Sequence, residues 1–135
     1  SKKITLLNNI FAQGKDAQIC LKSQGPLKGF VFKHNIIFWS KGKLFAAGFL
    51  KNSQMDLDSN LYYNPKKTAE QVTFGNMNCK EWYDEGNDLH SIFEEPKFLN
   101  EVNYSLDSLS PAFKIGFIPI DISKIGNFQS VFTEK

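Results

Sequence analysis

The chain has 135 residues, of which 16 are basic and 14 acidic, so its formal net charge is only +2. This length fits one domain with a sizeable core, and the weak, scattered charge argues against a nucleic-acid groove or a polybasic membrane patch. No run approaches the roughly 18 apolar residues of a membrane span, and the first residues lead into a strand-like pattern instead of a signal sequence. We therefore predict no nucleic-acid partner and no membrane span.

Three copies of one pattern occupy residues 4–12, 30–38 and 55–63, here called the first, second and third repeats. Aligning "ITLLNNIFA", "FVFKHNIIF" and "MDLDSNLYY" superposes Asn9, Asn35 and Asn60, at separations of 35 − 9 = 26 and 60 − 35 = 25 residues. The aligned apolar positions are Ile4, Phe30 and Met55, then Leu6, Phe32 and Leu57, then Ile10, Ile36 and Leu61. Apolar residues alternate in steps of two before each asparagine, which is the period of a strand with one buried face.

A period of about 25 residues indicates stacked structural units. Each repeat is a strand, a bend at asparagine and a short strand, which predicts one coil of a parallel β-helix. Asparagine tolerates the left-handed backbone of a sharp bend, and its amide can hydrogen-bond to the neighbouring coils. We predict that Asn9, Asn35 and Asn60 form an internal ladder; the alternative is three ordinary turn asparagines on an antiparallel sheet.

A further strand is expected after each repeat. "AQICLKS" and "GKLFAAG" follow the first two repeats and align Ile19 with Leu44 (44 − 19 = 25) and Leu21 with Ala46 (46 − 21 = 25). In the third repeat, the insertion "PKKTAEQ" delays the corresponding strand "EQVTFGN".

The repeating pattern ends after Gly75. "NCKEWYDEG" has Asn78 as a candidate N-cap, Glu81 three residues later and Gly86 at the expected end, so a short capping helix is predicted. Three prolines in the remaining sequence predict an extended, irregular segment across the end of the coils. We therefore divide one domain, 1–135, into coils over 1–76 and a cap with an extended segment over 77–135.

The amino-terminal coil has no such cover, because a strand begins at once at Ile4. Exposed strand edges pair readily with other chains. We expect this edge to be covered by upstream β-helix coils of a longer protein or by a second chain.

The order of "NNIF", "HNIIF", "SNLYYNP", "VTFG", "EWYDEGNDLHSIFEEPKFLN" and "SPAFKIGFIPIDISKIG" resembles the carboxyl-terminal region of bacterial right-handed parallel β-helix proteins of the pectate-lyase-like superfamily. The resemblance covers about residues 4–126 and is most specific from Glu81 to Asn100 and from Ser110 to Lys114. It implies a right-handed β-helix, secretion or periplasmic location, and a carbohydrate-active protein of the glycoside hydrolase or polysaccharide lyase type. The upstream coils, where most catalysis would lie, are not in this sequence.

Two carboxylates give the first candidate site. Asp56 and Asp58 are two apart on one predicted strand, so they share a face with side chains about 7 Å apart. Glycoside hydrolysis uses two carboxylates about 5 to 10 Å apart. The alternative is a solvated face, on which Lys33, aligned with Asp58, forms a surface ion pair.

A histidine and several aromatic residues give further candidates for substrate binding. His90 follows Asp88 closely and is either a proton shuttle or part of a hydrogen-bonded loop. The rings of Trp39, Tyr62 and Tyr63 either stack on sugars or fill the core, and the same alternatives hold for Trp82 and Tyr83. His34 precedes the bend at Asn35, where a turn role is the simpler account.

No cofactor is predicted. "MDLDSN" lacks the glycine and distal glutamate of an EF-hand loop, so calcium is open but unsupported, and no phosphate-binding loop is present. Cys20 and Cys79 lack the close spacing of a metal or redox motif; a disulfide is open, and two free thiols are favoured.

Three hypotheses remain. The first is the carboxyl-terminal part of a carbohydrate-active β-helix protein, glycosidase-like, with polysaccharide or oligosaccharide as its partner. The second is a non-catalytic module that binds polysaccharide or protein, and the third is a structural cap.

Overall fold

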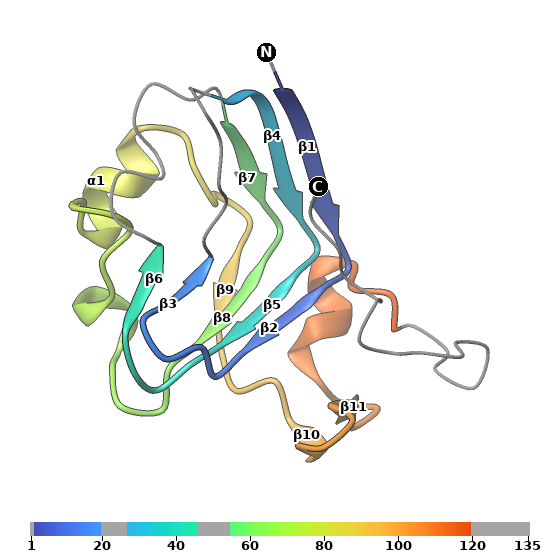
Figure 1. Ribbon diagram of the computed structural model, residues 1–135. Coiled ribbons are helices and arrows are strands. Elements are labelled where there is room, and N and C mark those ends of the chain that lie inside the picture. Colours follow the sequence, from blue (N-terminus) through green and yellow to red (C-terminus); the bar gives the residue numbers. More distant parts are fainter. Residues whose placement is uncertain (1, 20–26, 46–54, 120–135) are drawn as a thin grey trace.

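The computed structural model describes residues 2–19, 27–45 and 55–119 (Figure 1). The strands of this part are β1 (Lys2–Leu7), β2 (Ile10–Ala12), β3 (Ala17–Ile19), β4 (Leu27–Lys33), β5 (Ile36–Phe38), β6 (Lys43–Phe45), β7 (Met55–Asp58), β8 (Leu61–Tyr63), β9 (Ile92–Phe93), β10 (Phe98–Asn100) and β11 (Ser105–Leu106). The helices are the 3-10 turns η1 (Ala69–Gln71) and η2 (Pro111–Ile115) and the α-helix α1 (Cys79–Asp84).

Most strands lie in three parallel sheets, each built from successive repeats. The sheets have the orders β1-β4-β7, β2-β5-β8-β9 and β3-β6, while β10 and β11 form a small antiparallel pair. Figure 1 shows the strands of each parallel sheet side by side. The bends between the first and second strands of successive repeats lie next to one another. The predicted all-β class is confirmed, and the antiparallel alternative is wrong for the repeats.

The register between repeats agrees with the alignment of the sequence. Ile4 pairs with Phe30 and Phe30 with Met55, while Ile36 pairs with both Ile10 and Leu61. The intervening positions point outward, because neighbouring side chains on a strand lie on opposite faces. The side chains that alternate inward along β1, β4 and β7 are therefore the apolar ones.

The bend differs from the prediction in one respect. The left-handed residues are those that precede each asparagine, namely Asn8, His34 and Ser59, with φ between 55° and 59°. The asparagine that follows keeps an ordinary backbone conformation and uses its side chain for hydrogen bonding. Asp88, which also has a left-handed backbone with φ 54°, lies before β9.

One of the two alignments predicted for the strand after each repeat is corrected. Ile19 pairs with Phe45 and not with Leu44, because the loops of the first two repeats have equal length and the offset stays at 26 (45 − 19 = 26). The prediction for Leu21 and Ala46 lies outside the described residues.

The strand expected at "EQVTFGN" is absent from the described structure of the third repeat. Thr68 and Gln71 form a capping box that begins η1, and Phe74 makes only an isolated bridge with Met77. Val72 and Phe74 are nevertheless buried.

The predicted capping helix is confirmed as α1. The Asn78 side chain accepts a hydrogen bond from the Glu81 N–H, and the Glu81 side chain accepts one from the Asn78 N–H. The segment that follows is not wholly irregular, because β9 extends the parallel sheet beyond β8.

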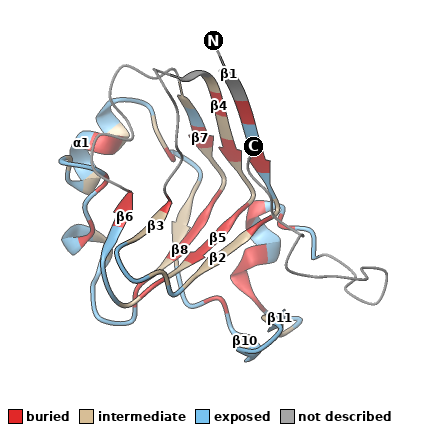
Figure 2. Ribbon diagram, viewed as in Figure 1, coloured by how far each residue is buried: buried red, intermediate tan, exposed pale blue. Residues whose placement is uncertain are grey.

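The core lies between the sheets, α1 and η1, and its buried faces are drawn red in Figure 2. It is rich in rings: Phe74 stacks on Trp82 with centroids 4.9 Å apart, and both are fully buried. A second cluster forms where Ile36 and Leu61 pack against Ala112, Ile115 and Phe117 near η2. Both ends of the described chain thus contribute to holding the repeats together.

Candidate functional site

The outer face of sheet β1-β4-β7 presents the first polar constellation. We call "the outer face" the outward side chains Thr5, Leu7, Val31, Lys33, Asp56 and Asp58, together with His90 beside them. The Lys33 Nζ lies 3.1 Å from Asp56 Oδ2, with both side chains substantially exposed. The expected pair of Lys33 with Asp58 is therefore corrected: Asp58 is the register neighbour of Lys33, but the ion pair runs diagonally to Asp56.

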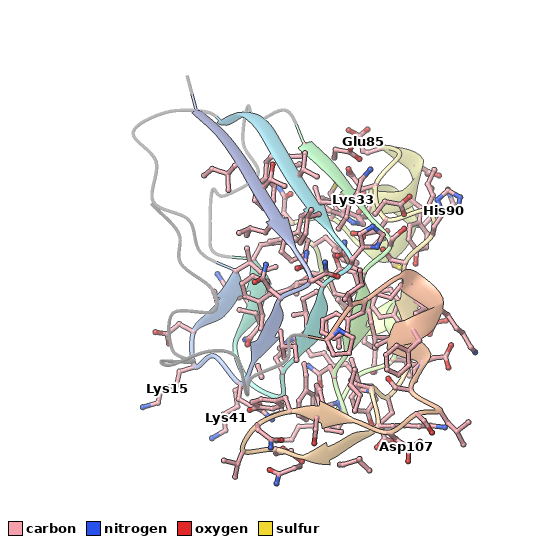
Figure 3. All side chains as sticks on the ribbon, turned by 90° about the vertical axis from the view of Figure 1, so that its right-hand side faces the viewer. Lys15, Lys33, Lys41, Glu85, His90 and Asp107 are labelled. Atoms are coloured by element: carbon pink, nitrogen blue, oxygen red, sulfur yellow. The ribbon has the colours of Figure 1, made fainter. Side chains whose placement is uncertain are left out.

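Asp58 is instead held by His90, which Figure 3 shows on the same side of the molecule as Lys33. The His90 backbone N–H donates to Asp58 Oδ1 at 2.7 Å, and His90 Nδ1 lies 2.7 Å from Asp58 Oδ2. Asp88, which lies two residues before His90 in the sequence, points elsewhere and does not form this contact. The structure thus assembles an Asp58–His90 pair from residues 90 − 58 = 32 apart in the chain.

The pKa of Asp58 follows from this contact. Burial favours a higher pKa for the Asp58 carboxyl, but the hydrogen bonds from the His90 ring and backbone outweigh it, so the pKa lies below its ordinary value of 3.8. A carboxyl of this kind is ionised at neutral pH. It is suited to act as a base, nucleophile or hydrogen-bond acceptor and poorly suited to act as a general acid.

His90 has the geometry of an oriented base. Its side chain is 77% exposed, and when Nδ1 donates to Asp58, the lone pair of Nε2 faces outward. Within the described residues, no hydroxyl or thiol is hydrogen-bonded to this ring, so a nucleophile of the serine or cysteine type is not assembled there. The arrangement can accept protons or hydrogen bonds from a ligand.

Three of the aromatic candidates are not at the surface. Trp39 is 2% exposed and Tyr62 is fully buried, so the hypothesis that these rings stack on sugars is corrected to core packing. Tyr63 is half-buried and stacks on Phe38 with centroids 5.9 Å apart. Trp82 is fully buried as well.

The asparagines are connected by hydrogen bonds through the buried bend. The N–H of Asn9 donates to Asn35 Oδ1 at 2.8 Å, and the N–H of Asn35 donates to Asn60 Oδ1 at 3.1 Å. Asn35 Nδ2 donates to the Leu6 carbonyl, and Asn60 Nδ2 donates to the Phe32 carbonyl. The side chains of Asn35 and Asn60 therefore each bond to the repeat before them, and we call Asn9, Asn35 and Asn60 the asparagine column.

Two residues that the sequence analysis did not identify, Ser91 and Asp88, form the end of the asparagine column. The N–H of Asn60 donates to Ser91 Oγ, and the N–H of Asp88 donates to the Leu57 carbonyl. Ser91 and Asp88 thus divide between them the bonds that a fourth asparagine would make. The signal was present, because "SIF" before residue 94 repeats the pattern of "NLY" in the third repeat.

Asp88 is fully buried and accepts four side-chain hydrogen bonds. Its Oδ1 accepts from Asn60 Nδ2 and Ser91 Oγ, and its Oδ2 accepts from Tyr62 Oη at 2.9 Å and Trp82 Nε1 at 2.7 Å. Burial, together with the neighbouring Asp88 carboxyl, raises the pKa of Tyr62 well above its ordinary value. Tyr62 therefore remains a neutral donor, and the network fixes the cap to the core.

Other predicted features are placed as follows. His34 Nδ1 lies 2.6 Å from the Ile115 carbonyl and joins a bend to η2. Cys79 carries a free, half-buried thiol, and Cys20 lies outside the described residues. Burial, with the neighbouring Cys79, raises the pKa of Tyr83.

Neither a metal cluster nor a spanning helix is found in residues 2–19, 27–45 and 55–119. No three side chains of His, Cys, Asp or Glu there are grouped to hold a metal ion. No helix of that part is long and apolar enough to cross a bilayer.

Comparison with known proteins gave no match: no family model, no curated protein and no solved structure is detectably similar to the chain.

Proposed function

We propose that this chain is the carboxyl-terminal part of a secreted or periplasmic carbohydrate-active protein with a right-handed parallel β-helix. In this proposal it closes the stack of coils and contributes a glycan-binding surface, while most catalysis lies in coils outside the chain. Parallel sheets that take one strand from each repeat support the β-helix, and the sequence resemblance supports its hand and its carbohydrate partner.

The observation that carries the glycan-binding surface is the pair of fixed contacts on the outer face. Lys33 is held by Asp56, and His90 is held by Asp58, all on or beside a sheet of parallel strands. Carboxylate, ammonium and imidazole groups can accept from and donate to sugar hydroxyls. Because they are already positioned, a ligand pays less conformational entropy to meet them.

The test is binding of the 135-residue chain to an array of neutral and acidic oligosaccharides. The double variant Asp56→Asn and Asp58→Asn is expected to lose at least tenfold in affinity for the glycan that binds best. Asp84→Asn is the control, because Asp84 forms an exposed ion pair with Lys80 on α1 and is not one of the outer-face residues. An array without any bound glycan, or equal losses in both variants, would contradict the proposal.

Hydrolysis at the same face is the second candidate. Asp56 and Asp58 are two apart on β7, which from the strand rise separates them by about 7 Å, within the range of glycosidase carboxylates. Asp58, with its lowered pKa, would be the nucleophile or base. Loss of reducing-sugar release in Asp58→Asn with retained glycan binding would support this role, and unchanged release would remove these residues from it.

A further coil over the first repeat is the partner in this proposal. Within the described residues, the side-chain amide of Asn9 forms no hydrogen bond, although Asn9 is only 8% exposed. The matching amides of Asn35 and Asn60 bond to the repeat before them. A coil before the first repeat would complete the same pattern, with an N–H for Asn9 Oδ1 and a carbonyl for Asn9 Nδ2.

A further inference from the structure

The hairpin formed by β10 and β11 carries a tripeptide of a kind that the rest of the chain lacks. Asn103-Tyr104-Ser105 matches the pattern Asn-X-Ser/Thr, with X other than proline, in which the asparagine accepts an N-linked glycan. No second Asn-X-Ser or Asn-X-Thr occurs among the 135 residues of the sequence. Short patterns of this kind also arise by chance, so the structural context decides what this one means.

The asparagine lies at the exposed tip of the hairpin. Residues 101–104 form the turn between β10 and β11, and Glu101, Val102 and Asn103 are all exposed. Figure 1 shows the hairpin projecting beyond the parallel sheets, and Figure 2 draws its tip in the pale blue of exposed residues. A bulky enzyme can therefore reach the Asn103 side chain while the chain stays folded.

The base of the hairpin is fixed in the fold. Phe98 and Leu106 pack against the second core cluster, and the Asp107 N–H donates to the Lys97 carbonyl. The Tyr104 ring meets the Phe98 ring edge to face, with centroids 5.0 Å apart. These contacts hold the two strands and the end of the turn, and they leave the tip in solvent.

The Asn103 side chain is held through its oxygen. The Ser105 N–H donates to Asn103 Oδ1 at 3.1 Å, which forms an Asx turn across the tripeptide. Within the described residues, Asn103 Nδ2 forms no hydrogen bond. The nitrogen that would receive a sugar is therefore unengaged, and the turn brings Ser105 back beside the asparagine.

A carboxylate lies two residues before the acceptor. Glu101 is exposed, and the ion pairs of the described structure do not involve it. Bacterial oligosaccharyltransferases select acceptors with an acidic residue at this position, which an arginine of the enzyme can bind through its forked guanidinium. The stretch from Glu101 to Ser105 therefore fits the longer bacterial acceptor pattern as well as the shorter general one.

We propose that Asn103 is an N-glycosylation site, to which a bacterial oligosaccharyltransferase transfers an oligosaccharide from a polyprenyl-diphosphate carrier. A bond forms between Asn103 Nδ2 and C1 of the first sugar, and the bond between C1 and the diphosphate oxygen breaks. Polyprenyl diphosphate leaves, and Nδ2 loses one proton to a base of the transferase. The attached sugars would also shield the neighbouring Val102, which is 84% exposed.

This inference rests on the secreted or periplasmic location proposed above, because these transferases act on the outer side of the cytoplasmic membrane. The acceptor is on a different part of the molecule from the outer face: Figure 3 shows Asp107, which follows β11, far from Lys33 and His90. A glycan at the tip of the hairpin would therefore leave the outer face free.

The test incubates the folded full chain with a purified bacterial oligosaccharyltransferase and an undecaprenyl-diphosphate-linked oligosaccharide. Intact mass spectrometry measures the fraction that gains one glycan, and peptide fragmentation should locate it on Asn103. Asn103→Gln and Ser105→Ala should each abolish the transfer, whereas Ser105→Thr should keep it. Glu101→Gln should lower the initial rate at least tenfold, and the matched control Glu85→Gln, at another exposed glutamate, should change it less than twofold.

The Ser105→Ala variant separates modification from structure. Its backbone N–H can still donate to Asn103 Oδ1, so its thermal unfolding temperature should equal that of the parent chain. No gain of mass by the parent chain, a glycan on another residue, or equal modification of Ser105→Ala would overturn the proposal. Because the components are purified, this outcome depends neither on export nor on the outer face, which the oligosaccharide array tests separately.

Discussion

At the scale of single residues, the asparagine column shows why one residue type recurs at the bend. An asparagine side chain has a donor and an acceptor, and it meets an N–H and a carbonyl of the repeat before it, as Asn35 does with Asn9 and Leu6. Buried backbone groups left without partners are costly, so the amide matters more for what it satisfies than for the bend itself. The bend is made by the preceding left-handed residue.

We predict that Asn35→Leu destabilises the chain by about 2 to 4 kcal/mol, because the buried Asn9 N–H and the Leu6 carbonyl lose their partners. Asn9→Leu should cost less than half as much, since the Asn9 side chain forms no hydrogen bond in the described structure. Urea unfolding of the two variants measures both values. Equal losses of stability in the two variants would contradict the expected difference between the inner position of the column, Asn35, and the outer position, Asn9.

The Asp58–His90 contact predicts a dependence of stability on pH. The folded-state pKa of Asp58 is lowered, so its contribution to stability is full above the unfolded-state value, near 3.8, and disappears as the pH falls through the folded-state value. Asp58→Asn should therefore lower the free energy of unfolding at pH 7, and the difference from the parent chain should shrink below about pH 4. A difference that stays constant from pH 7 to pH 2.5 would show that the carboxylate charge is not involved.

At the scale of elements, the loops between strands fix how closely the repeats stack. Gly42 has φ +76° and lies against the Lys15 and Asp16 carbonyls, so the loop of the second repeat needs both a left-handed backbone and the absence of a side chain. This contact keeps the offset at 26 residues from β2-β5 to β3-β6.

Gly42→Ala should destabilise the chain by about 2 kcal/mol or more, because it adds a steric clash to backbone strain. Gly86→Ala is the matched control: Gly86 has φ +87°, but an added Cβ there would meet nothing within 4 Å. Thermal unfolding of both variants separates the two effects. A loss for Gly42→Ala no larger than for Gly86→Ala would mean that the loops are not tightly packed.

An element could be predicted from the sequence where residues close together in the chain determine its structure. The strands of the three repeats followed from alternation and spacing, and α1 followed from its capping box, because both signals lie within a few residues. The η1 turn was missed because "QVTF" has the alternation of a strand, while the Thr68–Gln71 capping box decides the local structure. The β9 strand was missed because it has only two residues and because a helix separates it in the chain from β8, the strand with which it pairs.

The candidate site depended on contacts that sequence spacing does not show. The shared face of Asp56 and Asp58 was predictable from the period of two, and the structure places both there. The partner of His90 was not, because it is Asp58, 32 residues away, and not the nearby Asp88. Asp88 instead accepts hydrogen bonds from four side chains and closes the column.

At the scale of the whole molecule, the described structure is a stack with two different ends. One end is closed by Asp88, Ser91 and α1, and the other presents β1 and the unbonded Asn9 amide. The outer face lies along one side of this stack, on β1, β4 and β7. The unbonded Asn9 amide is where the proposed preceding coil would bind.

The central claim is that a glycan binds the outer face, and amide NMR with the best-binding glycan of the array tests it most directly. We predict that the largest shifts fall on Thr5, Val31, Lys33, Asp58 and His90 and that α1 changes little. Shifts confined to other parts of the chain, or no shifts at saturating glycan, would contradict the account.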